Sequence, residues 1–176
     1  KRLYKSFQPE HYDLQIEISE DKQTFKGSVV ITGKKVGRPS KRITLHQKNL
    51  QLTHVTMQSV DKKGDSVKVP ISRTVLHKTY NELRIHADDV LYPGAYVIEC
   101  TFNGTITNNM DGIYPCFYEI AGISKQLIAT QFESHHAREV FPCVDEPEAK
   151  ATFKTTLIHD THETALSNTP LKAQQA

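Results

Sequence analysis

The sequence contains no long apolar run. Nowhere in its 176 residues are there about 18 consecutive apolar residues, the length that a helix needs to cross a bilayer. The opening residues, Lys1 to Ser6, lead into polar sequence and do not resemble the hydrophobic part of a signal segment. We therefore expect a soluble chain with no targeting segment and no membrane partner.

The sequence also lacks a block of charge of one sign. It has 22 Lys and Arg residues against 20 Asp and Glu residues, for a formal charge of +2 at pH 7. Proteins that bind nucleic acid or anionic membranes carry clustered basic residues, so neither is an expected partner. A chain of this length forms one or two domains and buries roughly 70% of its unfolded surface.

Cysteine is scarce. The three residues Cys100, Cys116 and Cys143 are widely spaced and form no CxxC motif. An odd number of dispersed cysteines is not typical of a secreted disulfide framework, so we expect a cytoplasmic protein. Cys100 lies in phase with apolar neighbours, which predicts a small buried core residue.

The sequence does show apolar and polar residues in alternation, the pattern that is typical of β-strands. His11 to Ser19 places its apolar residues on one face and its charged residues on the other. Together with Thr24 to Thr32 it predicts an antiparallel hairpin. Further strands are expected at Arg42 to Gln47, Leu50 to Met57, Ser66 to Ile71, Thr74 to Lys78, Glu82 to His86, Ala95 to Ile106, Lys125 to Glu133, Ala151 to His159 and Thr164 to Ser167.

Other segments are expected to interrupt these strands. Asp88 and Asp89 are predicted to break the chain after one strand, and Gly104 to mark a bulge. Thr107 to Ala121 has no periodicity and is predicted to be a structured loop, while Ser134 to Val140 could hold one helical turn. Strands at this spacing, with turn residues between them, predict an all-β fold, a largely antiparallel sandwich or saddle-shaped sheet, which we assign to a single domain over residues 1–176. The sequence shows no long amphipathic helix and no repeat.

The candidate site lies between Ala129 and Pro147. In an extended backbone, Gln131 and Glu133 share one face while Phe132 points toward an apolar layer. An amide and a carboxylate that project together suit a small cation, because an unpaired buried carboxylate is costly. The alternative is a solvated polar pair on the outer face of a strand, and the residue pattern alone leaves both open.

The same stretch also holds residue types that could bind a metal. His135, His136, Cys143 and Asp145 are all zinc-ligand types, but adjacent histidines face opposite ways and no HxxxH or CxxC accompanies them. A turn bounded by prolines explains Asp145 as an acceptor for backbone N–H groups. The sequence starting at His162 resembles HExxH but lacks its last histidine. The remaining histidines, at positions 11, 46, 54, 77, 86 and 159, are expected at the surface.

An ordered set of motifs resembles the N-terminal domain of zinc aminopeptidases of the aminopeptidase N family, which are gluzincin metallopeptidases. The motifs are Tyr12 to Leu14, Met110 to Tyr114, Thr130 to Glu133, Ala137-Arg138, Phe141 to Pro147, Ala151 to Phe153 and Ala165 to Asn168. They cover essentially the whole chain in the family's order, which makes the set far more specific than any single tetrapeptide.

The resemblance implies a β saddle that packs on a thermolysin-like catalytic domain, expected downstream of this chain. It implies that Glu133 holds the α-amino group of a peptide with a free N-terminus and that Gln131 lines the same pocket. The parent would be a zinc metallo-aminopeptidase whose zinc ligands lie outside this chain. This chain would supply no metal ligand and no catalytic residue.

Two alternatives belong to other classes. Non-catalytic relatives of the family use this domain as an interaction scaffold, which requires neither zinc nor Glu133. A free-standing β-sandwich that binds a ligand is the other. The presence of both Gln131 and Glu133 favours the peptidase over these two alternatives.

Overall fold

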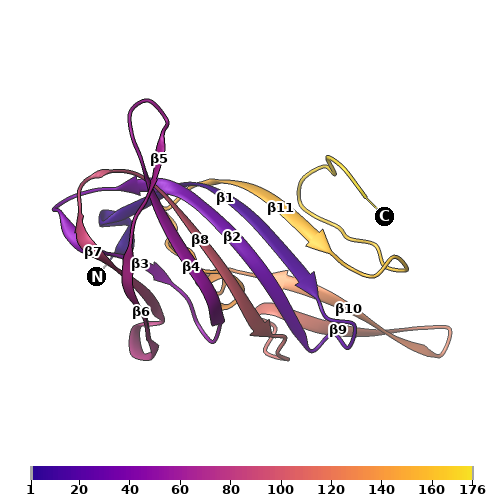
Figure 1. Ribbon diagram of the computed structural model, residues 1–176. Helices are drawn as coiled ribbons and strands as arrows, with labels where there is room; N and C mark the ends of the chain where they lie inside the picture. Colours follow the sequence, from indigo (N-terminus) through magenta and orange to yellow (C-terminus); the bar gives the residue numbers. More distant parts are fainter. Residues whose placement is uncertain (1, 176) are drawn as a thin grey trace.

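The computed structural model describes residues 2–175 and is built almost entirely of β-strands (Figure 1). This confirms the all-β prediction. The elements in order are η1 (Leu3–Lys5), β1 (Phe7–Ile18), β2 (Thr24–Lys35), β3 (Ser40–His46), β4 (Gln51–Val60), β5 (Ser66–Lys68), β6 (Ile71–His77), η2 (Lys78–Tyr80), β7 (Glu82–Leu91), β8 (Gly94–Thr105), β9 (Gly112–Ile120), β10 (Ile123–Gln131), η3 (Ala137–Glu139) and β11 (Thr152–Ile158).

The strands form three sheets. A six-stranded sheet has the order β11-β1-β2-β8-β4-β5, a three-stranded sheet has the order β3-β7-β6, and β9 with β10 forms a separate hairpin. All pairings are antiparallel except that of β11 with β1. In Figure 1 the orange β9–β10 hairpin extends away from the body of the molecule.

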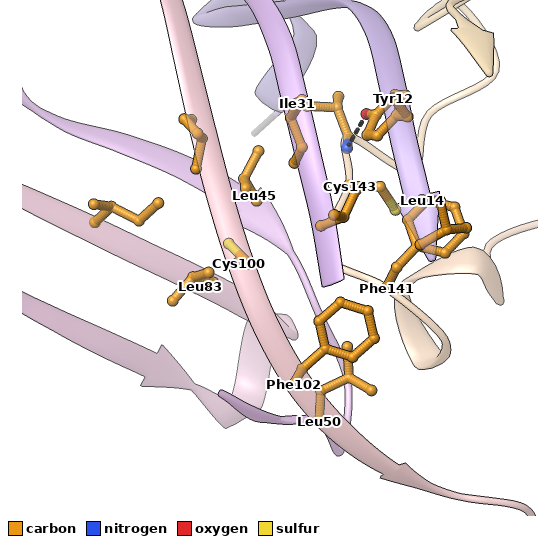
Figure 2. Close-up of a cluster of buried hydrophobic side chains, with 14 of the residues drawn as sticks. Tyr12, Leu14, Ile31, Leu45, Leu50, Leu83, Cys100, Phe102, Phe141 and Cys143 are labelled. Atoms are coloured by element: carbon orange, nitrogen blue, oxygen red, sulfur yellow. Dashed lines mark hydrogen bonds between the residues drawn. The ribbon is translucent and has the colours of Figure 1, made fainter. Parts of the chain in front are cut away.

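The hydrophobic core is built from the alternating strands that the sequence predicts. Cys100 of β8 is fully buried, and it lies near Leu45 of β3 and Leu83 of β7 in Figure 2. This burial confirms the predicted small core residue, and it raises the pKa of the Cys100 thiol to about 12. Each large side chain buried in this way stabilises the fold by about 1.5–3 kcal/mol.

The prediction that Thr107 to Ala121 forms a loop is wrong for most of this segment. Residues 112–120 form β9, which pairs with β10 throughout, and the chain reverses at Ala121 and Gly122 with positive φ at both. Pro115 made this strand hard to recognise from the sequence, because proline is typical of loops. It is tolerated here because β9 is an edge strand that needs no outward hydrogen bond.

Three smaller predictions were also wrong. Asp88 and Asp89 lie inside β7, in a bulge where Lys41 Nζ donates to the Asp88 carbonyl over 2.6 Å. Gly104 causes no break in the ladder; it faces the ring of Phe25, and a Cβ there would collide with that ring. Residues 164–167 form no strand.

Candidate functional site

The residues predicted to bind a cation lie where β10 ends. Gln131 is the last residue of β10, and Glu133 lies in the turn that follows, so the strand predicted to run through Glu133 stops two residues early. Gln131 Oε1 accepts a hydrogen bond from the Glu133 backbone N–H at 3.0 Å. Both residues are exposed, whereas Phe132 between them packs against the core, with its ring 6.0 Å from that of Phe141.

The turn that carries Glu133 is closed by its own backbone. The His136 N–H donates to the Phe132 carbonyl over 2.9 Å, and η3 begins at the next residue. This confirms the helical turn predicted between residues 134 and 140. The carboxylate of Glu133 is therefore presented to solvent from a short turn fixed at both ends.

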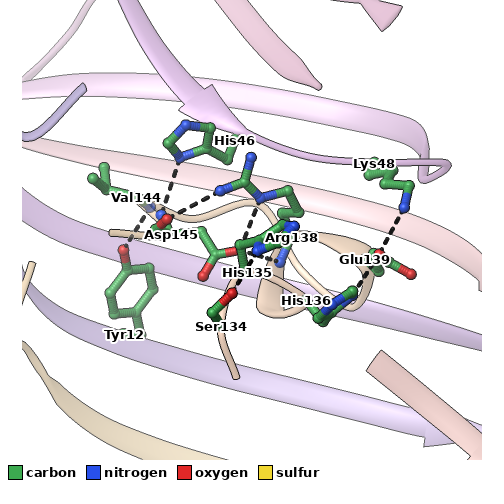
Figure 3. A network of polar contacts seen from close by, with 10 residues as sticks. All are labelled: Tyr12, His46, Lys48, Ser134, His135, His136, Arg138, Glu139, Val144 and Asp145. Atoms are coloured by element: carbon green, nitrogen blue, oxygen red, sulfur yellow. Dashed lines mark hydrogen bonds and ion pairs between the residues drawn. The ribbon is translucent and has the colours of Figure 1, made fainter. Parts of the chain in front are cut away.

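An ion pair anchors the segment that follows the turn. Arg138 Nε lies 2.8 Å from Asp145 Oδ2, and the Arg138 side chain also donates to the Asp145 carbonyl over 3.0 Å (Figure 3). The Arg138 backbone N–H donates to the same carboxylate over 3.3 Å, so Asp145 does accept from the backbone as predicted. With only 13% and 10% of the two side chains exposed, solvent screens this pair little.

His46 was predicted at the surface, and this is wrong. It is buried at the end of β3, exchanges two backbone hydrogen bonds with Cys143, and its Nδ1 accepts from the Asp145 N–H over 3.1 Å. Burial, reinforced by the nearby Arg138 charge, lowers the pKa of His46 to about 4. The ring is therefore neutral at pH 7, with its proton on Nε2.

Tyr12 holds the same segment from the other side. Its hydroxyl accepts a hydrogen bond from the Val144 N–H at 3.1 Å (Figure 3). Its ring stacks on that of Phe153 of β11, with 4.8 Å between the ring centroids. Burial raises the pKa of the Tyr12 hydroxyl well above its ordinary value. Residues 143–145 are thus tied to both β1 and β3.

A second chain of polar contacts links the turn to the start of β9. His136 Nδ1 lies 2.9 Å from Glu139 Oε1, and its Nε2 lies 3.6 Å from Asp111 Oδ1. Lys48 Nζ contacts the same Glu139 oxygen at 2.9 Å. Burial raises the pKa of Glu139, but the hydrogen bonds from Lys48 and His136 outweigh it, so that this pKa lies below its usual range. Gly112, which follows Asp111, is paired directly with Gln131.

These contacts leave no donor set that fits zinc. His136 directs its ring nitrogens at Glu139 and Asp111, Asp145 is bound by Arg138, and Cys143 is buried with its thiol pKa raised by that burial. Across residues 2–175, no three His, Cys, Asp or Glu side chains come together as a metal site would require. In the same residues, none of the helices has the length and apolar character of a membrane span.

The fold and the site define an all-β domain that presents an amide and a carboxylate at the end of one strand. Comparison with known proteins gives its family. The model of the peptidase M1 N-terminal domain matches residues 8–176, and the chain belongs to this family, the N-terminal domains of aminopeptidase N-type peptidases.

Relatives include two bacterial proteins and one mammalian protein. Aminopeptidase N of Lactococcus lactis subsp. lactis is 42% identical over 172 residues, which cover 96% of this chain. Aminopeptidase N of Lactobacillus delbrueckii subsp. lactis is 38% identical over 97% of the chain, and glutamyl aminopeptidase of Sus scrofa is 31% identical over 99%. The chain spans only 18%, 18% and 19% of the length of these relatives, respectively.

Proposed function

We propose that this chain is the N-terminal domain of a zinc-dependent aminopeptidase, a hydrolase that removes N-terminal residues from peptides. In this proposal the domain caps the active-site cleft, and Glu133 and Gln131 bind the substrate's α-amino group. One observation carries the proposal: in a member of this family, an exposed carboxylate is held beside Gln131 in a turn anchored to the core.

Gln131 and Glu133, which we call the clamp, would recognise the substrate's ammonium group by its positive charge. A carboxylate that accepts hydrogen bonds from an ammonium group contributes about 1.5–3 kcal/mol when partly desolvated. The hydrogen bond from the Glu133 N–H to Gln131 Oε1 orients the turn and leaves the second lone pair of that oxygen for the amine, beside the exposed Glu133 carboxylate. Fixing the amine in one place selects the first peptide bond for cleavage.

The metal belongs to another part of the parent. Zinc bound there would polarise the scissile carbonyl and activate water. The residues of this chain only bind and orient the substrate, so the chain alone is expected to be inactive. Its three free cysteines suit a reducing compartment, and we propose the cytoplasm.

The test is Glu133→Ala in the full-length parent. We expect kcat/KM for free-amino peptides to fall at least tenfold, which corresponds to about 1.4 kcal/mol of lost transition-state binding. Glu119→Ala is the matched control, because Glu119 is an exposed carboxylate of the same hairpin and we expect no change there. An unchanged kcat/KM in Glu133→Ala would remove this residue from the site.

A second measurement identifies the group that is recognised. The wild-type parent should prefer a free-amino peptide over the same peptide without its α-amino group. In Glu133→Ala this preference should shrink by the same factor as kcat/KM. A preference that survives intact would show that the amine is bound elsewhere.

A further inference from the structure

His136 is the last residue of the turn that carries Glu133, which spans residues 132–136 and which we call the clamp turn. The Nδ1 of the His136 ring lies 2.9 Å from Glu139 Oε1 (Figure 3), and its Nε2 lies 3.6 Å from Asp111 Oδ1. Only 18% of the His136 side chain and 16% of the Glu139 side chain are exposed. A contact to a carboxylate that is shielded in this way restrains a side chain more than a surface pair does.

The other polar side chains of the clamp turn have no such tie to the body of the domain. Ser134 Oγ lies 2.7 Å from His135 Nδ1, and both residues are exposed. Glu133 is exposed as well, and its contact with Gln131 Oε1 is made by its backbone N–H. His136 is therefore the polar side chain that connects the clamp turn to the rest of the domain.

The carboxylate that His136 contacts is itself held in place. Lys48 Nζ lies 2.9 Å from the same Glu139 oxygen, and the Lys48 backbone N–H donates to the Arg138 carbonyl over 2.7 Å. Burial acts to raise the pKa of Glu139, but the hydrogen bonds from Lys48 and His136 keep it below its usual range, so the group is ionised at pH 7. His136 is thus bound by a charge whose own position is fixed from η3 and from the loop that follows β3.

The place of the Glu133 carboxylate depends on both ends of the clamp turn. At one end, Gln131 is paired with Gly112 in the ladder of the hairpin. At the other end, the His136 N–H donates to the Phe132 carbonyl, and the His136 ring is bound as described above. Without the ring, residues 133–136 have no polar side chain that anchors them, and a binding group displaced by about 1 Å can lose most of its effect on the rate.

We propose that His136 is a positioning residue of the clamp: through its contact with Glu139 it holds the clamp turn so that the Glu133 carboxylate stands where the substrate amine arrives. This rests on the proposed function, and it names a residue that acts on amine recognition without touching the substrate.

The test uses the full-length parent and two peptides, one with a free α-amino group and the same peptide without it. The ratio of the two kcat/KM values measures amine recognition. A variant that merely leaves fewer molecules folded lowers both values together and does not change the ratio. We expect His136→Ala to lower the ratio at least about fivefold, which corresponds to about 1 kcal/mol of lost transition-state binding.

Two further variants complete the comparison. His136→Asn should keep the ratio within about twofold of the wild type, because its amide can donate to Glu139 from near the place of Nδ1. His135→Ala is the matched control, since it removes an exposed histidine of the same turn whose ring centroid lies 4.8 Å from that of His136. It should leave the ratio unchanged.

Three results would overturn the proposal. An unchanged ratio in His136→Ala would show that the clamp turn holds its place without this ring. A fall in His136→Asn as large as that in His136→Ala would show that the contact with Glu139 is not what matters. An equal fall in His135→Ala would assign the effect to the stacking of the two rings.

A double variant separates positioning from direct contact with the substrate. If His136 acts only through Glu133, adding His136→Ala to Glu133→Ala should leave the ratio where Glu133→Ala alone puts it. A further fall in the double variant would mean that His136 meets the substrate itself, which contradicts the proposal.

The clamp and its positioning by His136 fail in different ways. A ratio that falls in Glu133→Ala but not in His136→Ala leaves the clamp in place and refutes the role of His136. A ratio that is unchanged in Glu133→Ala refutes both, because His136 would then have no clamp to position.

Discussion

Acid should destabilise this fold through His46, and the size of the effect follows from its burial. The imidazole is neutral in the folded chain because burial, with a smaller effect of the nearby Arg138 charge, lowers its pKa; its Nδ1 accepts the Asp145 N–H. Its pKa is about 4 in the folded chain, against an ordinary value of 6.5 that applies after unfolding. The unfolded state therefore binds more protons between these two values, so stability is complete above pH 6.5 and falls as the pH drops toward 4.

The magnitude can be worked from the two pKa values. At pH 5 the unfolded imidazole is almost fully protonated and the folded one almost fully neutral, which costs at most about 2 kcal/mol relative to pH 7. Below pH 4 both states are protonated and this contribution changes no further. A loss of this size is a large fraction of the stability of an ordinary domain.

The assay compares urea unfolding of the wild-type chain and His46→Asn at pH 7 and pH 5. Asparagine keeps an acceptor for the Asp145 N–H but does not titrate, so the wild type should lose about 2 kcal/mol more than the variant between the two pH values. His54→Asn, which removes an exposed histidine of β4, controls for the change in charge. Equal losses in the wild type and His46→Asn would refute the reasoning.

Three further substitutions test the segment behind the clamp and the packing of the large sheet, each by the free energy of unfolding in urea. Tyr12→Phe leaves the buried Val144 N–H without its acceptor and should cost about 1–3 kcal/mol; no loss would mean that another group accepts it. Asp145→Asn removes the charge that binds a largely buried guanidinium and should cost about 2–3 kcal/mol, and a smaller loss at high salt alone would show that the pair is solvent-screened. Gly104→Val forces methyl groups into the ring of Phe25 and should cost about 1–3 kcal/mol, whereas a neutral result would show that the ring moves aside freely.

The sequence predicted strands well where one face of the sheet meets solvent. β1 and β8 alternate between buried and less buried residues; β8 was located to within one residue at each end, and β1 was located except for its first four residues. β3 ends in four consecutive buried residues, so His46 occurs where no alternation distinguishes inside from outside. The sequence pattern therefore does not distinguish a buried histidine at this position from a surface one; the segment that packs against the end of β3 must also be known.

The contacts around the candidate site were beyond the reach of local patterns. Lys48 and Glu139 are 91 residues apart in the chain, and His46 and Asp145 are 99 apart. Such pairs depend on how separate elements pack, which spacing along a sequence does not encode. Gln131 and Glu133 were selected by motif, and their partnership through the backbone N–H of Glu133 could only be seen in three dimensions.

The pairing of β11 with β1 has a consequence for the synthesis of this protein. Tyr12 stands opposite Phe153 in the only parallel pairing that the large sheet shows over residues 2–175, so β1 is translated well before β11, the strand that completes its edge. Until residues beyond 158 leave the ribosome, β1 has an open edge and lacks the aromatic ring that covers Tyr12. The nascent chain is therefore most prone to aggregate when residues 3–144, which supply nearly all of this core, have been made and β11 has not.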